Sequence, residues 1–379
     1  MTGSSSGAGD CEPEPPPLRV QGPADLVELV PYLVGFHPSD SVVVVAFDPL
    51  AQRVGLVLRA DRADLRSEPE LRDRLANHVA RTGAWELVVV VVASGDDAMP
   101  LAGAALPDVD LVTGITEAVT REGLSVADAL YVGSGRWWSY RCRGEGCCPL
   151  DGRPVRGPAS RVAAEATYAG LVALPDRAAL AAGLDPLGRE EQDRFGVAVE
   201  RAAVERARHR GLRERGQWRE AARGRVQRAL DRLDGSGPVP WLPDRAAGRL
   251  VVALGDVAIR DDAWLWMEQA SSRWMPALEL WRQLARRAPA PYRVPPLFLA
   301  SWAAWRSGSG ALARLAVERA LEIDPDYGAA GLLEQAIAQG MDPRTAPPLV
   351  PPAAVAAAGC PERPGAAGHV RDRRGRAGQ

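Results

Sequence analysis

The sequence contains no lysine, because all 46 of its basic residues are arginine. A chain without lysine cannot form a lysine Schiff base, use a lysine general base or supply the lysine of a phosphate-binding P-loop. Pyridoxal-phosphate chemistry, ordinary P-loop chemistry and protein-kinase chemistry are therefore excluded. The exclusive use of arginine is typical of a GC-rich bacterial genome.

Histidine and cysteine are also scarce. Four histidines offer little material for a multi-histidine metal site or a catalytic triad. Of the five cysteines, three lie within seven residues and one lies near each end, which does not resemble a secreted disulfide framework. The histidines are His37, His78, His209 and His369.

Signals for export and membrane insertion are missing as well. The N-terminal stretch is acidic and proline-rich, without the basic start and apolar centre of a signal peptide. No apolar run reaches the roughly 20 residues that span a bilayer. The net charge of −2 provides no overall field to attract nucleic acid or an anionic membrane. We expect a cytoplasmic, soluble protein with neither a membrane nor a nucleic-acid partner.

The first half of the chain alternates apolar strands with helical patterns. Residues 1–17 have almost nothing to bury and predict a disordered leader. Strands that are apolar on both faces, such as Val42–Phe47 and Leu87–Ala93, indicate a sheet covered by helices on each side. We predict a mixed α/β domain over 18–175, with Val54–Leu58 as the hairpin partner of the first strand. Within it we expect a helix over Pro69–Arg81 and a last hairpin strand over Arg136–Tyr140.

The second half has helical periodicity, which predicts an all-α domain over 176–340. Thirteen arginines and eight acids lie in 189–232, and the interleaved acids favour a solvated helix face with i,i+4 pairs. Residues 296–325 predict a tetratricopeptide-like helical hairpin, which suggests a protein partner. Residues 341–379 predict a disordered tail.

Two segments carry a family resemblance. The first is Val30–Ser41 followed by the valine strand, and the second is Trp137–Tyr140 with Cys142 and the Cys147-Cys148-Pro149 triplet. Both resemble the actinobacterial domain-of-unknown-function family 4192, and the similarity extends over roughly residues 18–340. The resemblance implies no activity, cofactor or site residue.

The clustered cysteines allow three interpretations. Structural zinc needs four ligands, usually in closely spaced cysteine pairs, whereas the gap here is Cys-x₄-Cys followed by an adjacent cysteine. A redox-active or nucleophilic thiol is a second possibility. Packing of cysteine as a small apolar residue is the interpretation that we favour, so we expect no metal site. The residues are Cys142, Cys147 and Cys148.

The neighbouring Trp137 and Trp138 should point to opposite faces of a strand. With Arg136 and Tyr140 they form a rim suited to stacking a ring or a base. Packing in the core or at an interface explains the same residues, and we favour it.

His37 precedes a proline in the turn before the first strand, with Asp40 and Ser41 close by. These residue types could perform acid–base chemistry. Capping of a turn by Asp and Ser also explains them. Aspartates at strand ends lie where a carboxylate metal site would be built, although turn chemistry explains each one. They are Asp48, Asp61, Asp96 and Asp97.

We therefore predict a binding protein whose helical half contacts a protein partner. The alternative is an enzyme or small-ligand-binding domain with its site at one sheet edge. That alternative requires the turn around His37 to meet the 136–148 segment around one pocket. Catalytic residues, cofactors and the oligomeric state do not follow from the sequence.

Overall fold

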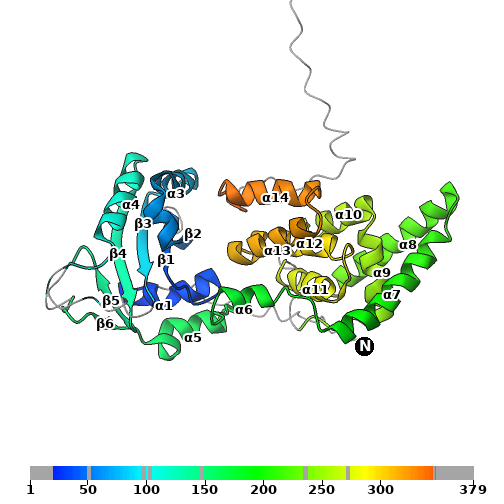
Figure 1. Cartoon of the computed structure of the whole chain (residues 1–379), viewed down its shortest axis with the longest axis horizontal. Coiled ribbons are helices and arrows are strands. Elements are labelled where there is room, and N and C mark those ends of the chain that lie inside the picture. Colours follow the sequence, from blue (N-terminus) through cyan, green and yellow to red (C-terminus); the bar gives the residue numbers. More distant parts are fainter. Residues whose placement is uncertain are drawn as a thin grey trace, which may run out of the picture. The chain divides into compact units, whose positions relative to one another are not determined.

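The computed structural model describes residues 20–48, 53–94, 100, 105–142, 144, 148–233, 238–269, 274–344 and 346. The leader expected at 1–17 and nearly all of the tail expected at 341–379 lie outside these residues. Figure 1 shows a mixed α/β structure, as the sequence predicted, in which a helix-rich segment follows the strands along the chain.

Six strands form one mixed sheet in the order β2-β1-β3-β4-β5-β6. The β1–β2 hairpin is confirmed, because these strands pair antiparallel, and β3 and β4 form the parallel pair. The strand predicted over 136–140 is β5, and a short strand that the sequence pattern did not predict follows it. The strands are β1 (Ser41–Asp48), β2 (Arg53–Asp61), β3 (Glu86–Val92), β4 (Ser125–Gly133), β5 (Arg136–Ser139) and β6 (Arg153–Pro154).

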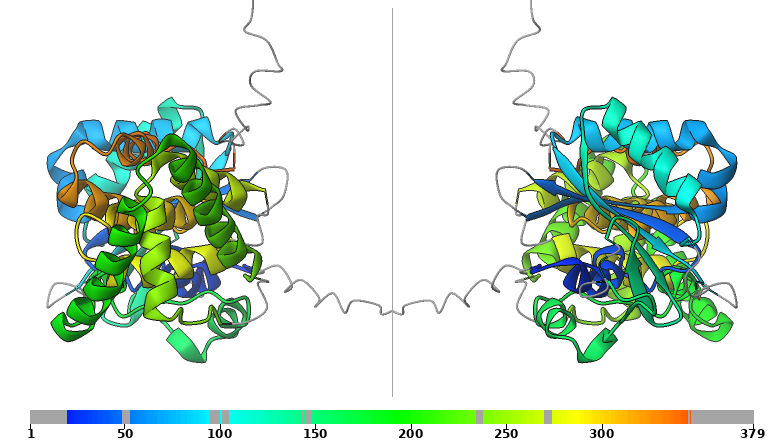
Figure 2. Two further views of the ribbon diagram at one scale, coloured as in Figure 1. Left: turned by 90° about the vertical axis from the view of Figure 1, so that its right-hand side faces the viewer. Right: turned by 90° about the vertical axis from the view of Figure 1, so that its left-hand side faces the viewer.

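Both faces of the sheet are buried, because successive valines point to opposite sides. Val42 and Val44 pack with α3 (Pro69–Arg81) and α4 (Val109–Arg121). Val43 and Val45 belong to a second cluster that includes α1 (Pro23–Val34). In the right-hand view of Figure 2 the strands run between dark-blue α1 below and blue and cyan α3 and α4 above.

Local signals explain the helix ends in this half. Pro23 occupies the first turn of α1, and Gly35 ends the helix with φ of 88°, donating its N–H to the Pro31 carbonyl. This positive φ suits glycine, which lacks a Cβ. The predicted helix over 69–81 matches α3. The shorter helices α2 (Arg62–Ser67), α5 (Arg161–Tyr168) and α6 (Arg177–Ala182) were not predicted.

Eight longer helices follow in the described part of the chain, as the helical periodicity predicted. The first two are α7 (Arg189–Ala207) and α8 (Leu212–Asp231). The remaining helices are α9 (Asp244–Leu254), α10 (Val257–Glu268), α11 (Trp274–Arg287), α12 (Val294–Arg306), α13 (Gly310–Ile323) and α14 (Gly328–Ala338).

The segment predicted as a tetratricopeptide-like hairpin contains α12 and α13. The two helices pack through small residues, and the buried Ser301 hydroxyl donates to the Ala313 carbonyl at 2.7 Å. This establishes a helical pair. Its assignment to the tetratricopeptide type stays a prediction.

Tryptophan anchors much of this helical core. Trp281 is fully buried, and Trp302 packs edge-on against Trp264 and Trp305 with ring centroids 4.7 and 5.1 Å apart. Trp241 differs, because 56% of it is exposed while it lies over the Arg287 guanidinium.

Candidate functional site

Polar residues from four parts of the chain meet at one edge of the sheet. Ser41 pairs with Asp61 and with Val92, so the start of β1 lies beside the ends of β2 and β3. Helix α4 connects the parallel strands β3 and β4. In α/β sheets ligands bind outside the carboxyl ends of parallel strands. We therefore treat this carboxyl edge as the first candidate site.

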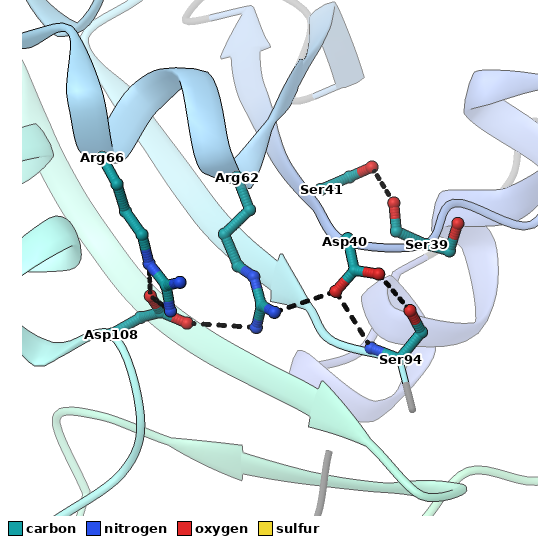
Figure 3. Close-up of polar contacts among 7 residues, drawn as sticks. All are labelled: Ser39, Asp40, Ser41, Arg62, Arg66, Ser94 and Asp108. Carbon is teal, nitrogen blue, oxygen red and sulfur yellow. Dashed lines mark hydrogen bonds and ion pairs between the residues drawn. The ribbon is translucent and has the colours of Figure 1, made fainter. Parts of the chain in front are cut away.

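Asp40 lies at the start of this edge and accepts three hydrogen bonds (Figure 3). The Ser94 hydroxyl donates to one carboxylate oxygen, and Arg62 Nη2 donates to the other at 2.8 Å. The Ser94 N–H reaches the same second oxygen at 3.4 Å. The Ser94 hydrogen bonds, with the charges of Arg62 and Arg66, lower the pKa of the Asp40 carboxyl. Asp40 therefore stays ionised in the folded protein.

Asp108 completes the cluster from the start of α4. Arg62 Nη1 donates to one of its oxygens at 3.3 Å, and Arg66 Nε donates to the other at 2.6 Å. The Asp108 side chain is fully buried, so its two arginine contacts offset the cost of removing a charge from water. Arg62 thus joins two carboxylates from different parts of the chain.

Both aspartates adopt the left-handed backbone region. The φ angle is 42° at Asp40 and 62° at Asp108. Non-glycine residues rarely occupy this region, although aspartate tolerates it better than most. The arginine contacts offset part of this conformational cost.

The chemistry of this cluster is that of a nearly neutral ion-pair network. Two carboxylates face two guanidinium groups, and the Asp108 carboxylate is enclosed. Asp40 remains open, with 53% of its side chain exposed beside exposed Ser94. The cluster holds the starts of β1, α2 and α4 in place, and it leaves the ionised Asp40 carboxylate at the surface.

The other candidates from the first turn have separate roles. His37 is exposed, and its backbone N–H donates to the Leu174 carbonyl at 2.9 Å. Ser41 is buried; its hydroxyl donates to the Ser39 carbonyl and accepts from Arg59 Nε. Arg59 also pairs with Asp61, one of the strand-end aspartates. The side chain of Asp48 and residues Asp96 and Asp97 lie outside the described part.

The two tryptophans do point to opposite faces, as predicted. Trp137 belongs to the cluster with α1, and Trp138 belongs to the cluster with α3 and α4. Both are buried, so their rings are not open for stacking. Trp138 Nε1 donates to the Leu150 carbonyl at 3.0 Å, and Arg136 Nη2 donates to the Gly152 carbonyl at 2.9 Å.

The enzyme or ligand-binding alternative requires the turn around His37 to meet the 136–148 segment, and the two meet only in part. Two strands separate β1 from β5, which corresponds to about 14 Å at about 4.8 Å per strand spacing. Tyr140 nevertheless reaches the cluster, because its hydroxyl donates to the carbonyl of Pro107, next to Asp108. Burial, and then the Asp108 charge, raise the pKa of Tyr140, so its hydroxyl stays protonated.

The cysteine cluster is described only in part. Cys142 and Cys148 are half-buried, and Cys147 lies outside the described residues. The Cys142 N–H donates to Ser139 Oγ at 3.1 Å, and the Cys148 N–H donates to the Gly144 carbonyl at 2.7 Å. Within the described ranges no group of three or more His, Cys, Asp or Glu residues is arranged to hold a metal ion.

Sequence reasoning missed four members of the cluster: Arg62, Arg66, Ser94 and Asp108. The sequence shows Arg62 directly after a strand and Asp108 directly before a helix, which are the positions of a carboxyl edge. It does not show that α2 lies beside the start of α4, since this contact joins residues more than 40 positions apart.

A second candidate surface lies on the helices. A groove of about 540 Å³ runs between α7 and α9, whose backbones approach closely at Gly248. A Cβ at that position would lie 2.9 Å from the Ala198 carbonyl group, so only glycine allows this approach. The charged residues lining the groove are Arg194, Arg201, Arg245, Arg249, Glu205 and Asp244.

The expected i,i+4 pairs do not neutralise the arginines of α7 and α8. Of the 13 arginines in 189–232, only four form ion pairs with described residues. Three of these pair with acids on α10 or just before it. The fourth contacts an acid of its own helix, three residues away, and Asp244 on α9. The four are Arg194, Arg206, Arg219 and Arg223. This expectation was wrong for the described residues, among which no i,i+4 ion pair forms on α7 or α8. Glu205, for example, pairs with Arg249 on α9 instead.

Comparisons with known proteins define the family. A family model described as "Domain of unknown function (DUF4192)" matches residues 23–344. The chain therefore belongs to this family. No curated protein and no solved structure matches the chain. Among the described helices, none is both long and apolar enough to cross a membrane.

Proposed function

We propose that this protein is a protein-binding module of the cytoplasm and that its helical half provides the binding surface. The groove between α7 and α9 supports the proposal most directly, because it combines exposed Val197 with two exposed arginines, Arg201 and Arg245, that form no ion pair with the described residues. The packed α12–α13 pair is a further feature common in interaction domains.

The candidates at the sheet have contacts that support a structural role. Asp40 and Asp108 tie loops together, Trp137 and Trp138 fill the two cores, and Arg136 binds backbone carbonyls. These contacts leave fewer groups for chemistry than the sequence suggested.

A photo-crosslinking experiment tests this proposal. A photoreactive amino acid replaces exposed Val204 on α7 in one variant and exposed Tyr168 on α5 in a control variant. Both are expressed in an actinobacterial host, the origin that the family resemblance suggests. We expect one defined crosslinked protein from position 204 and none from position 168. Equal crosslinking at both positions, or none at either, would contradict the proposal.

A small-ligand site at the carboxyl edge is the second candidate function. The observation in its favour is the open side of Asp40, an ionised carboxylate held in the left-handed region beside Arg62 and Ser94. A thermal-shift screen of small polar metabolites tests it. A ligand at this site should raise the melting temperature of the natural protein and not that of Asp40→Asn.

A further inference from the structure

Exposed residues on α7 form a stripe that alternates arginine with valine. Arg194, Val197, Arg201 and Val204 follow each other at intervals of three, four and three residues, so they share one helix face. Val197 and Val204 are 47% and 54% exposed. The two valines lie seven residues apart, which is one heptad, so a helix laid along this face could contact both.

The acids beside the stripe are already neutralised within the protein. Glu205 accepts two hydrogen bonds from Arg249, at 3.0 and 3.1 Å. Asp244 pairs with buried Arg287, which is itself held between the rings of Phe195 and Trp241. Both acidic side chains of the groove therefore already have ion-pair partners within the protein.

The arginines of the groove differ in whether they form ion pairs. Arg201 and Arg245 are exposed and form no ion pair with any described residue. Arg194 has only long contacts, 3.8 Å from Glu191 and 3.9 Å from Asp244. The surface thus offers unpaired positive charge close to the exposed valines, from Arg201 between them on α7 and from Arg245 on α9.

From this geometry we propose that the α7–α9 groove binds an acidic amphipathic helix of a partner protein. The inference rests on the proposed function and adds the chemistry of the partner. The helix would place apolar residues on Val197 and Val204, and carboxylates opposite Arg201 and Arg245. Recognition of this kind combines apolar anchors at helical spacing with charges that select the partner.

Nucleic acid fits this surface less well than an acidic helix. A nucleic-acid-binding domain is usually strongly basic, with a pI above about 9. The sequence pI is about 6.2 here, and Glu205 and Asp244 line the groove itself. The exposed valines also have no counterpart on a phosphate backbone, whereas they match the apolar face of a helix.

Fluorescence anisotropy on the full chain tests the proposal with synthetic helices of about 20 residues, the length that covers α7. All peptides share one leucine stripe and carry Glu, Gln or Lys at the flanking positions. We expect the Glu peptide to bind, the Gln peptide to bind at least about tenfold more weakly and the Lys peptide not to bind. Added salt should weaken the Glu complex.

Charge-reversed variants locate the site. Arg201→Glu with Arg245→Glu should weaken binding of the Glu peptide by about 30-fold and create binding of the Lys peptide. The control pair, Arg213→Glu with Arg215→Glu, makes the same change in net charge on exposed positions of α8 outside the groove. It should change the affinity by less than about threefold.

Three results would overturn the inference. They are equal binding of all three peptides, equal losses in the two variant pairs, and tighter binding of a single-stranded RNA than of the Glu peptide. A protein crosslinked at Val204 without any binding of the Glu peptide would refute the acidic helix alone. The protein-binding role would then stand.

Discussion

Arginine serves two purposes in this molecule. At the carboxyl edge of the sheet, Arg62 and Arg66 contact Asp40 and Asp108, and these contacts hold the starts of three elements. On α7 and α8 most arginines have no ion-pair partner within the described residues, although acids are close in sequence. A paired arginine stabilises the fold, whereas an exposed and unpaired one remains available to a partner.

The largest expected effect concerns Asp108, the buried carboxylate of the ion-pair cluster at the carboxyl edge of the sheet. Asp108→Asn leaves Arg62 and Arg66 without their shared carboxylate, so the free energy of unfolding should fall by about 3–4 kcal/mol. Denaturant unfolding measures this change. Glu117→Gln on the exposed face of α4 is the control and should have little effect. A loss below about 1 kcal/mol would contradict a structural role for the Asp108 ion pairs.

The loop beside β5 provides the next test. Gly152 has φ of 70°, and a Cβ there would lie 2.3 Å from Trp138 Cε2. Gly152→Ala should therefore cost about 2–3 kcal/mol through strain and overlap.

Gly135 has nearly the same φ, 72°, but a Cβ added there would meet no atom within 4 Å. Gly135→Ala should cost about 1 kcal/mol from backbone strain alone. Equal losses at the two positions would show that Trp138 moves aside and is not a fixed part of the core.

The cysteines give a smaller expected effect. Replacing Cys142, Cys147 and Cys148 together by Ser should lower the free energy of unfolding by about 1–2 kcal/mol if they only pack. Elemental analysis and an alkylation time course accompany the unfolding measurement. A metal content near one equivalent, or selective fast labelling at neutral pH, would show that this segment is chemically active.

The smallest effect is a pH dependence. Burial, with the charges of Arg81 and Arg74, lowers the pKa of His78 in the folded protein. The unfolded chain, with a histidine pKa of about 6.5, therefore takes up the proton first as the pH falls. The stabilisation is complete above about pH 6.5 and decreases below it. In His78→Gln the free energy of unfolding should therefore depend less on pH in this range. The same pH dependence in the variant and the natural protein would contradict the role given to His78.

Local patterns predicted most of the fold. Consecutive valines indicated a sheet buried on both faces, and Pro69–Arg81 was predicted with its observed ends, because these features depend on neighbouring residues. The cluster around Asp108 could not be predicted in the same way. It depends on where α2 and α4 lie in space, and their polar residues are also common at turns and helix ends.

The ion pairs of α7 and α8 could not be predicted from the sequence for a related reason. Interleaved acids suggested pairs within one helix, but several charged side chains of these helices pair with residues of α9, of α10 or just before α10 instead. Glu205 reaches Arg249 across that interface, which no spacing within α7 reveals. Arg201, four residues before Glu205, therefore does not form an ion pair with it.

Hydrogen exchange of the full chain, with and without the acidic helical peptide, tests the contrast between the two regions most directly. We predict that bound peptide slows exchange along α7 and α9 and leaves Asp40, α2 and the start of α4 unchanged. Protection at the carboxyl edge with none on α7 would contradict the account, because it would make the paired network the binding site.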